Sequence, residues 1–304
     1  MTKSQQTEIA DLRALSTRVG RDPLLVQASS GNTSIKLADT IWIKASGKWL
    51  ARATEADAFV PVPLTGLRAA LNRNEHLTAI GAIIGGASIE TAMHAVLPHR
   101  VVIHVHSVNA ISWAVRRDGE HCLAGRLAGL NWCWIPSVAS GLPLAQAIAA
   151  ALTALPDTNV FVLANHGLVV GGDSCSDAED LLGAVERRLA VRPRNEPQYG
   201  DPVTARILQG GILYPCQAIF LGPEPPLLND AAWDSMTDIQ RAVLDGLLQV
   251  VRRIDEPDSI RYLSETEVND LLSHDVHRYL ECARKNAAKA EAPSAAPAVA
   301  RAGN

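Results

Sequence analysis

Apolar and polar positions alternate along the first two thirds of the chain with a period that changes from segment to segment. Residues 5–20 carry apolar side chains at every third or fourth position, which predicts an amphipathic helix. A Gly-Asn turn then precedes two short strands, one ending at Leu37 and one in the segment TIWIKA, with a turn at Ala38–Asp39 between them. The segment FVPVP is a further extended piece, and residues 64–74 have a helical pattern.

The same interleaving continues downstream. Ser88 is a suitable N-cap for a helix from about residue 89 to residue 97, and the segment VVIHVHSVN that follows predicts a buried strand. GLPLAQAIAAALTAL has a strong helical pattern, and NVFVLANHGLVVGG predicts two strands around a polar turn. Ser176 and Glu179 form a capping box for a helix that ends near Val191. Alternating elements of this kind favour an α/β domain layered around a sheet.

The pattern changes after this helix. The segment RPRNEPQYGDP is proline-rich and polar, as linkers are, and the region beyond it contains a strand-like piece, YPCQAIFLG, and two helices. The Ala/Pro-rich end of the chain has the composition of a disordered tail. We therefore expect a main domain over residues 1–200, an extension over residues 201–285 and a tail over residues 286–304.

Composition and charge exclude several functional classes. The 304 residues are 47% hydrophobic and 20% charged, as in globular proteins. A net charge of −4 with scattered Lys and Arg gives no nucleic-acid footprint, and no apolar run reaches the roughly 20 residues of a membrane span. The polar start is not a secretory signal, and five separated cysteines without a C-x-x-C pair indicate reduced thiols. We expect a cytoplasmic protein without nucleic-acid or membrane partners.

Two histidines in the predicted strand VVIHVHSVN are the first candidate functional residues. His104 and His106 share one face because strand side chains alternate, so a shared metal would satisfy both imidazoles. Catalytic zinc sites usually take a third protein ligand, and His166 is the best placed of the other histidines, since Gly167 allows close backbone approach. An H-x-H pair alone is more often two packed or surface histidines. The third histidine and a nearby acid favour the metal.

That acid is Glu90, in the first turn of the helix that leads into the His104 strand. A glutamate there could simply complement the helix dipole, but beside a metal it would serve as a general base. His94 lies on the same helix face, either as a partner of the site or as a packed core residue. The turns GNTSIK and KASGK expose backbone N–H groups and hydroxyls suited to phosphate oxygens. Gly-Asn turns are also common between secondary-structure elements without any binding role.

Taken in order, these motifs resemble the class II aldolase/adducin family, from about residue 8 to residue 192. The segments SIETAMHAVLP and HVHSVNAISW are similar to the aldolase module of bifunctional rhamnulose-phosphate aldolase/dehydrogenase proteins, although the chain is too short for the dehydrogenase module. The motifs that carry the resemblance are Gly31-Asn32-Thr33-Ser34, Ser46-Gly47, Glu90, His104-Val105-His106 and Asn165-His166-Gly167-Leu168.

The resemblance implies a three-layer αβα fold with a central mixed, mostly antiparallel sheet, a mainly helical C-terminal extension and a homo-oligomer, with a tetramer favoured. It implies Zn²⁺, or another divalent metal such as Mn²⁺ or Co²⁺, on His104, His106 and His166. The implied reaction cleaves a phosphorylated ketose or deoxy-ketose through a metal-stabilised enediolate to dihydroxyacetone phosphate and an aldehyde. Glu90 would move the proton. The phosphate would bind to Asn32, Ser46, Gly47 and Ser88.

The chain departs from the family pattern at three points. Ser88-Ile89 replaces the usual serine pair, and Lys44-Ala45 stands where many members have Thr-Pro. The stretch after the H-x-H pair contains no tyrosine, which in simple members donates the second proton. Three functions therefore stay open: the aldolase, a decarboxylase of a 3-oxo sugar-acid phosphate or pentulose-phosphate epimerase on the same site, and a non-catalytic adducin-like module.

Overall fold

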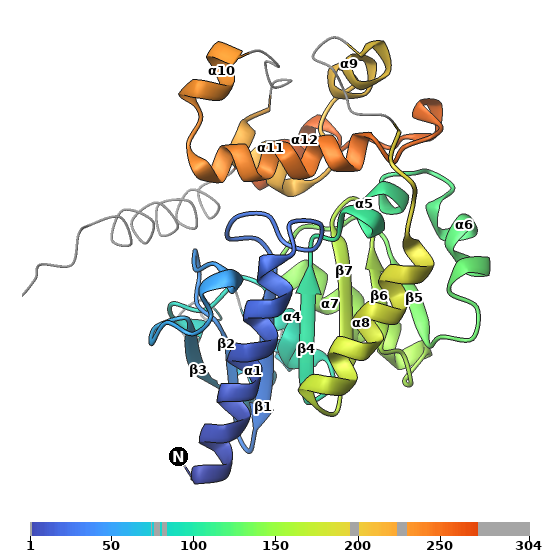
Figure 1. Cartoon of the computed structure of the whole chain (residues 1–304). Coiled ribbons are helices and arrows are strands. Elements are labelled where there is room, and N and C mark those ends of the chain that lie inside the picture. The colour runs from blue at the N-terminus through green and yellow to red at the C-terminus, as the bar shows by residue number, and fades with distance from the viewer. Residues whose placement is uncertain are drawn as a thin grey trace, which may run out of the picture.

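A seven-stranded mixed sheet forms the centre of the molecule (Figure 1). The strand order is β3-β2-β1-β4-β7-β6-β5, and every neighbouring pair is antiparallel except β5 and β6. The computed structural model describes residues 2–73, 75, 80, 84–194, 201–223 and 230–272. The strands are β1 (Asn32–Leu37), β2 (Thr40–Lys44), β3 (Phe59–Pro63), β4 (Val101–Val105), β5 (Trp132–Ile135), β6 (Val160–Leu163) and β7 (Gly167–Gly172).

Helices cover both faces of the sheet, which gives the three-layer αβα arrangement that the resemblance implies. The helices of the main domain are α1 (Lys3–Arg21), α2 (Leu64–Asn72), α4 (Thr91–Val96), α5 (Val108–Ala114), α6 (Gly119–Arg126), α7 (Leu142–Ala154) and α8 (Cys175–Leu189). A short 3-10 turn, η1 (Leu50–Arg52), packs beside α1. Among the described residues, no helix combines the length and apolar character that crossing a bilayer requires.

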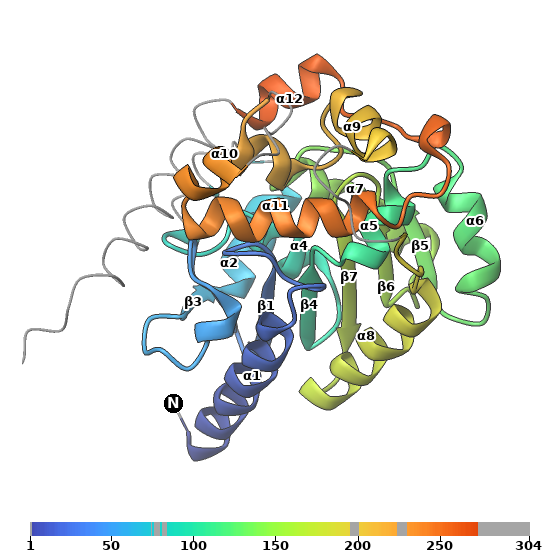
Figure 2. The ribbon, with the colours of Figure 1, turned by 45° about the horizontal axis from the view of Figure 1, so that its top comes forward.

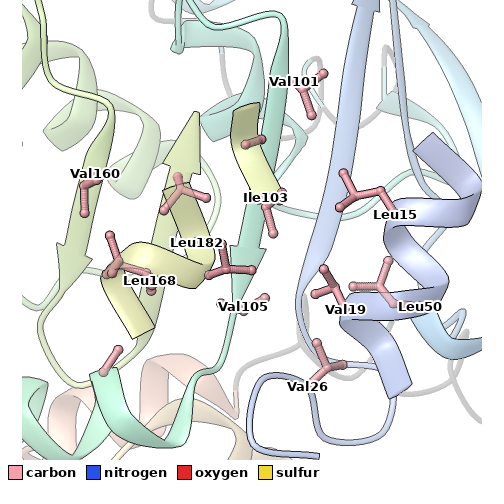
Figure 3. Packing of buried hydrophobic residues seen from close by; sticks show 14 of the residues in the cluster. Leu15, Val19, Val26, Leu50, Val101, Ile103, Val105, Val160, Leu168 and Leu182 are labelled. Atoms are coloured by element: carbon pink, nitrogen blue, oxygen red, sulfur yellow. The ribbon is translucent and has the colours of Figure 1, made fainter. Parts of the chain in front are cut away.

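Strand β4 separates the two hydrophobic layers. Its residues Val101, Ile103 and Val105 pack with α1 and α8, among them Leu15, Val19 and Leu182 (Figure 3). Val102, on the opposite face, packs with Met93 of α4 and with the apolar side of α7. His104 follows Val102 on that second face, as strand alternation predicts. The central strand therefore carries its first imidazole towards α4 and away from the larger apolar layer.

The C-terminal extension, here residues 201–272, lies across one end of the sheet, with α11 running over the ends of the central strands (Figures 1 and 2). Its apolar cluster includes Val108 and Ile111 of α5, so the extension and the main domain share a hydrophobic contact. The elements are α9 (Pro202–Gln209), the π-helical turn η2 (Gln217–Leu221), α10 (Asp230–Ser235), α11 (Asp238–Val251), η3 (Pro257–Ser259) and α12 (Glu265–Leu271).

Four local predictions are wrong. The extension, for which the pattern predicts two helices, contains four α-helices within its described residues. The apolar piece YPCQAIFLG is a helical turn, because a short apolar run does not distinguish strand from buried helix by periodicity. Helix α4 begins at Thr91 with Glu90 as N-cap residue, since Ser88 instead forms the preceding turn and its carbonyl accepts from the Thr91 N–H. Helix α8 is capped by Ser174, two residues before the predicted Ser176, because Ser174 is the residue whose extended backbone follows β7.

Other expectations are confirmed or fall outside the described residues. The strand ending at Leu37 and the strand at FVPVP are present, and the turn between β1 and β2 has Ala38 in the left-handed region. The capping box of the last helix is formed by Ser264 and Glu267. Most of the predicted linker and the whole predicted tail lie outside the described residues, and the division of the chain into domains stays a prediction.

Lys36 on β1 provides a test of the packing. The side chain is 9% exposed, its Nζ donates to the His99 carbonyl, and burial together with the Arg68 charge lowers the pKa of Lys36 to about 7. The unfolded chain, with a lysine pKa near 10.5, then binds more protons, so the free energy of unfolding rises between pH 7 and about pH 10. The contribution of Lys36 between pH 7 and pH 9 is about 2 kcal/mol.

We expect Lys36→Met to flatten this rise by that amount, measured by urea denaturation at a series of pH values. The exposed residue Lys3 serves as the control, because Lys3→Met leaves the pH dependence of the wild type. Parallel curves for Lys36→Met and wild type would show that the Lys36 ammonium is stabilised in the fold.

Candidate metal centre

Three buried imidazoles meet beyond the end of β4. The ligand atoms of His104, His106 and His166 all lie within 4.8 Å of one another, and the three ring centroids are 5.0 Å apart in edge-to-face pairs. The side chain of His104 is fully buried, and those of the other two are nearly so. The structure thus brings together the three histidines that the sequence singles out.

The sheet register places these histidines. His104 and Val105 pair with Val169 and Leu168 of β7, so His106, one step further, lies beside the turn before β7. Leu163 and Gly167 pair directly across this turn, and Asn165 takes a left-handed conformation with φ 52° to close it. A Cβ on Gly167 would lie 2.5 Å from the Val105 carbonyl oxygen. The close approach expected of this glycine is therefore present, and it brings His166 to the end of β4.

The outer nitrogens of two of these rings have partners. His104 Nδ1 lies 3.1 Å from the Leu168 carbonyl oxygen, which only accepts, so Nδ1 carries the hydrogen and the Nε2 lone pair faces inwards. His106 Nδ1 lies 3.0 Å from the Sγ of Cys216, in the extension. Partners of this kind fix the ring orientation and tautomer of metal-binding histidines.

The inner nitrogens have the spacing that a metal requires. His106 Nε2 and His104 Nε2 are 3.2 Å apart. Two nitrogens bound to tetrahedral zinc at about 2.0–2.1 Å lie about 3.3 Å from each other. Burial also lowers the pKa of His104 to about 4 and that of His106 well below its usual value, so both rings are neutral at pH 7 and keep a lone pair for a metal. The donor set therefore fits a divalent metal of the zinc type.

Glu90 closes the open side of the three rings. Its Oε2 lies 3.3 Å from His104 Nε2 and its Oε1 lies 3.2 Å from His166 Nε2. Burial opposes ionisation of this carboxyl, but the neighbouring imidazoles and a hydrogen bond from His166 hold the pKa of Glu90 well below its usual range. The ionised carboxylate therefore faces the same centre as the histidines, as expected of a base beside a metal.

A chain of hydrogen bonds orients Glu90, and each donor in this chain determines the next acceptor. Asn32 Nδ2 donates to Glu90 Oε2 at 2.8 Å and to Ser88 Oγ at 3.1 Å. The other amide atom, Oδ1, then accepts from His94 Nε2, so His94 Nδ1 accepts from the Ser34 hydroxyl at 2.7 Å. His94 is thus both fully buried and a hydrogen-bonded partner of the site, which joins the two alternatives left by the sequence. Asn32 is in this place because it pairs with His104 across β1 and β4.

The four residues predicted for phosphate lie in three segments, namely the start of β1, the turn after β2 and the segment before α4. Ser46 N–H donates to the Gly86 carbonyl and Gly47 has φ 72°, so the Ser46-Gly47 turn runs beside the segment that leads to Ser88. Asn32 reaches the same segment through Ser88, as described above. Asn32 and Ser88 are therefore in direct contact with each other and with Glu90, while Ser46 contacts Gly86, two residues before Ser88.

Lys44 joins the two turns. Its Nζ donates to the carbonyl oxygens of Ser29 and Lys48, and its side chain is 2% exposed. Burial lowers the pKa of Lys44 to about 7, against the opposing effect of Glu90. The Oγ of Ser29, buried in the same place, has no hydrogen-bond partner among the described residues. A buried amine that titrates near neutral pH and an unsatisfied hydroxyl thus lie beside the Ser46-Gly47 turn.

Two contributors to the site were missed by sequence reasoning. Cys216 carries no motif and lies 110 positions from its partner His106. Ser140, whose Oγ is 3.4 Å from Glu90 Oε1, lies in a loop before α7. No local pattern marks either residue, since both act through contacts between distant segments.

Comparison with known proteins agrees with this geometry. Residues 11–192 match the family described as Class II Aldolase and Adducin N-terminal domain. The chain belongs to this family. A solved N-terminal class II aldolase domain of a conserved protein from Thermoplasma acidophilum superposes with a TM-score of 0.53 at 24% identity, over 60% of this chain and 92% of that one. That likeness shows the class II aldolase fold.

Two curated relatives differ in their named activities. The uncharacterized oxidoreductase YuxG of Bacillus subtilis strain 168 is 24% identical over 283 residues, which are 87% of this chain and 37% of that protein. Methylthioribulose-1-phosphate dehydratase of Microcystis aeruginosa is 31% identical over 175 residues, 52% of this chain and 82% of that enzyme. The chain spans little more than a third of the first relative's length. Class II aldolase family membership therefore leaves the individual reaction open.

The metal centre predicts a specific loss on mutation. We expect the purified chain to bind about one Zn²⁺ or Co²⁺. His104→Ala is expected to lose the metal, because only two protein nitrogens would remain and water would have to fill the other positions. His121→Ala is the matched control, since His121 is exposed on α6. Metal content by inductively coupled plasma mass spectrometry checks this, and a His104→Ala protein with full metal content would contradict the assignment.

Proposed function

We propose that this chain is a divalent-metal-dependent class II aldolase, a carbon–carbon lyase that cleaves a phosphorylated ketose or deoxy-ketose to dihydroxyacetone phosphate and an aldehyde. The observation that carries the proposal is the convergence of three buried imidazoles and one ionised carboxylate on a single point. A non-catalytic adducin-like module has no use for such a set. The three-imidazole donor set favours Zn²⁺, with Mn²⁺ or Co²⁺ as alternatives.

A metal held by His104, His106 and His166 would polarise the substrate carbonyl as a Lewis acid. Glu90 handles the proton. Its Oε2 accepts from the Asn32 amide at 2.8 Å. When His166 binds a metal, Oε1 keeps only the 3.4 Å contact with the Ser140 hydroxyl, so Oε1 is the oxygen that would face a substrate. In the cleavage direction the ionised Glu90 takes up the proton that the C4 hydroxyl releases, the C3–C4 bond breaks, and its electron pair stays on C3. Glu90 then delivers that proton to C3, and the C4 fragment leaves as the aldehyde.

The phosphorylated end of the substrate suits the turns beside Glu90. The Gly47 N–H and the Ser88 hydroxyl offer hydrogen bonds to phosphate oxygens. Ser46, whose N–H donates to the Gly86 carbonyl, shapes the turn. Asn32, whose amide donates to Ser88 and Glu90, positions the Ser88 hydroxyl. The Lys44 amine and the Ser29 hydroxyl, which has no partner among the described residues, add further donors beside the same turn. These groups support a phosphorylated substrate and offset the hydroxyl that is missing at Ile89.

A second candidate is dehydration of a phosphorylated ketose. The observation that favours it is the 31% identity to methylthioribulose-1-phosphate dehydratase over 82% of that enzyme. Here Glu90 would remove a proton from the carbon next to the carbonyl and the hydroxyl on the following carbon would leave as water. Decarboxylation of a 3-oxo sugar-acid phosphate and pentulose-phosphate epimerisation remain alternatives on the same residues.

We also propose a cytoplasmic homo-oligomer, with a tetramer favoured by the family resemblance. The described cysteines, Cys122, Cys133, Cys175 and Cys216, are all free thiols, which suits a reducing compartment. Light scattering on the purified chain measures the assembly.

One product assay separates the reactions. Metal-loaded protein is incubated with ketose 1-phosphates, methylthioribulose 1-phosphate, pentulose phosphates and 3-oxo acid phosphates, and four outcomes are scored: dihydroxyacetone phosphate, dehydrated product, epimer and carbon dioxide. We expect dihydroxyacetone phosphate with an equal amount of aldehyde. Dehydrated product with an intact carbon skeleton would replace the aldolase by the dehydratase, and no turnover of any member by metal-loaded protein would contradict both.

Glu90→Gln tests the proposed base. We expect it to keep metal and fold but to lower kcat by about two to four orders of magnitude, because the amide accepts no proton. Glu179→Gln is the control, since Glu179 pairs with Arg18 on the surface of α1 and α8. Full activity in Glu90→Gln would show that another residue moves the proton.

A further inference from the structure

We propose that the C-terminal extension, residues 201–272, forms the outer shell of the metal centre and holds two of its three histidines in their metal-binding orientation. The inference rests on the proposed metal-dependent function and assigns a part in it to residues outside the matched family region, 11–192. It depends on two independent contacts. Cys216 contacts His106, and Leu213 and Arg261 bind the side chain of Asn165, the residue before His166.

The first contact orients His106. Cys216 Sγ lies 3.0 Å from His106 Nδ1, and both side chains are buried. When the inner nitrogen of a neutral imidazole binds a metal, the outer nitrogen must carry the hydrogen and donate it. Cys216 Sγ is the acceptor placed for that hydrogen. When a metal binds Nε2, the thiol sulfur is therefore placed to accept the Nδ1 hydrogen and to hold the ring in that orientation.

The position of Cys216 is fixed by its own segment. It directly precedes the π-helical turn, where Gln217 N–H donates to the Tyr214 carbonyl and Gln217 Oε1 accepts from the Leu213 N–H at 2.9 Å. Tyr214 and Cys216 are buried in the cluster that joins the extension to α5. Irregular helical turns of this kind often occur at functional sites. The position of the Cys216 sulfur is therefore fixed by the apolar packing of Tyr214 and Cys216 and by the hydrogen bonds of Gln217 to the residues before it.

The second contact orients the turn of His166. Asn165 Nδ2 donates to the carbonyl oxygens of Leu213 and Arg261, both at 2.8 Å. Arg261 Nη1 donates in return to Asn165 Oδ1 at 2.7 Å. The Asn165 side chain is thereby fully engaged with the extension, and the residue next to it in the chain is His166. The left-handed turn that presents His166 is thus anchored from outside the sheet.

Arg261 is itself tied to both parts of the molecule. Its Nη2 donates to Glu267 Oε1 at 2.7 Å, and Glu267 accepts from the Ser137 hydroxyl of the main domain at 2.8 Å. Its backbone N–H donates to the Val115 carbonyl after α5. His104, by contrast, is oriented by the Leu168 carbonyl within the sheet. One histidine is therefore held by the sheet alone, and two depend on the extension.

Cys216→Ala in the full-length chain tests the first contact. Zn²⁺ affinity is measured by competition with a chromophoric chelator, and the melting temperature of the metal-free protein reports the fold. We expect about 10- to 100-fold weaker zinc binding, the usual cost of losing an outer-shell partner. Cys216→Ser, whose oxygen also accepts, keeps most of the affinity. Cys133→Ala is the control, because Cys133 is buried on β5 among other residues.

Arg261→Gln tests the second contact with the same measurement, and Arg206→Gln is its control, since Arg206 pairs with Asp258 at the surface. We expect weaker zinc binding in Arg261→Gln and wild-type binding in Arg206→Gln. Wild-type zinc affinity in both Cys216→Ala and Arg261→Gln would overturn the inference and leave the metal site intact. Failure of the wild-type chain to bind zinc would overturn the metal-dependent function, and the inference with it.

Discussion

The arrangement of this protein depends on the burial of three imidazoles whose inner nitrogens face one another. Each ring has to present a lone pair inwards, so each needs an acceptor for the hydrogen on its outer nitrogen. The sheet supplies that acceptor for His104 at Leu168, and the extension supplies it for His106 at Cys216. The close backbone approach at Gly167 follows from the same requirement, since a side chain there would separate the turn from β4.

The chemistry follows from how the carboxylate is held against these rings. Glu90 has one oxygen bound by the Asn32 amide, whose orientation is fixed in turn by His94 and Ser34. The other oxygen lies 3.2 Å from His166 Nε2 and 3.4 Å from the Ser140 hydroxyl, and it is the oxygen we propose for proton transfer. The proposed cleavage and the dehydration named for one relative would both use this carboxylate to move a proton on the carbon next to the carbonyl.

Most of the metal centre could be predicted from the sequence because it follows from local rules. Strand alternation puts His104 and His106 on one face, and a glycine after His166 indicates a close approach. The remainder depends on contacts between distant segments, which no local period encodes. Cys216 lies in an apolar run whose pattern predicts a strand, but this run forms a helical turn. Ser88 fits an N-cap pattern, but its hydroxyl is used by Asn32 and the helix begins later.

X-ray absorption spectroscopy of the zinc-loaded chain is the most direct test of this account. We predict a first shell of nitrogen and oxygen atoms near 2.0–2.1 Å, with the outer scattering of three imidazoles and no sulfur. A sulfur shell near 2.3 Å would make Cys216 a ligand instead of an outer partner. A fit with fewer than three imidazoles would contradict the assignment of His104, His106 and His166 as the metal ligands.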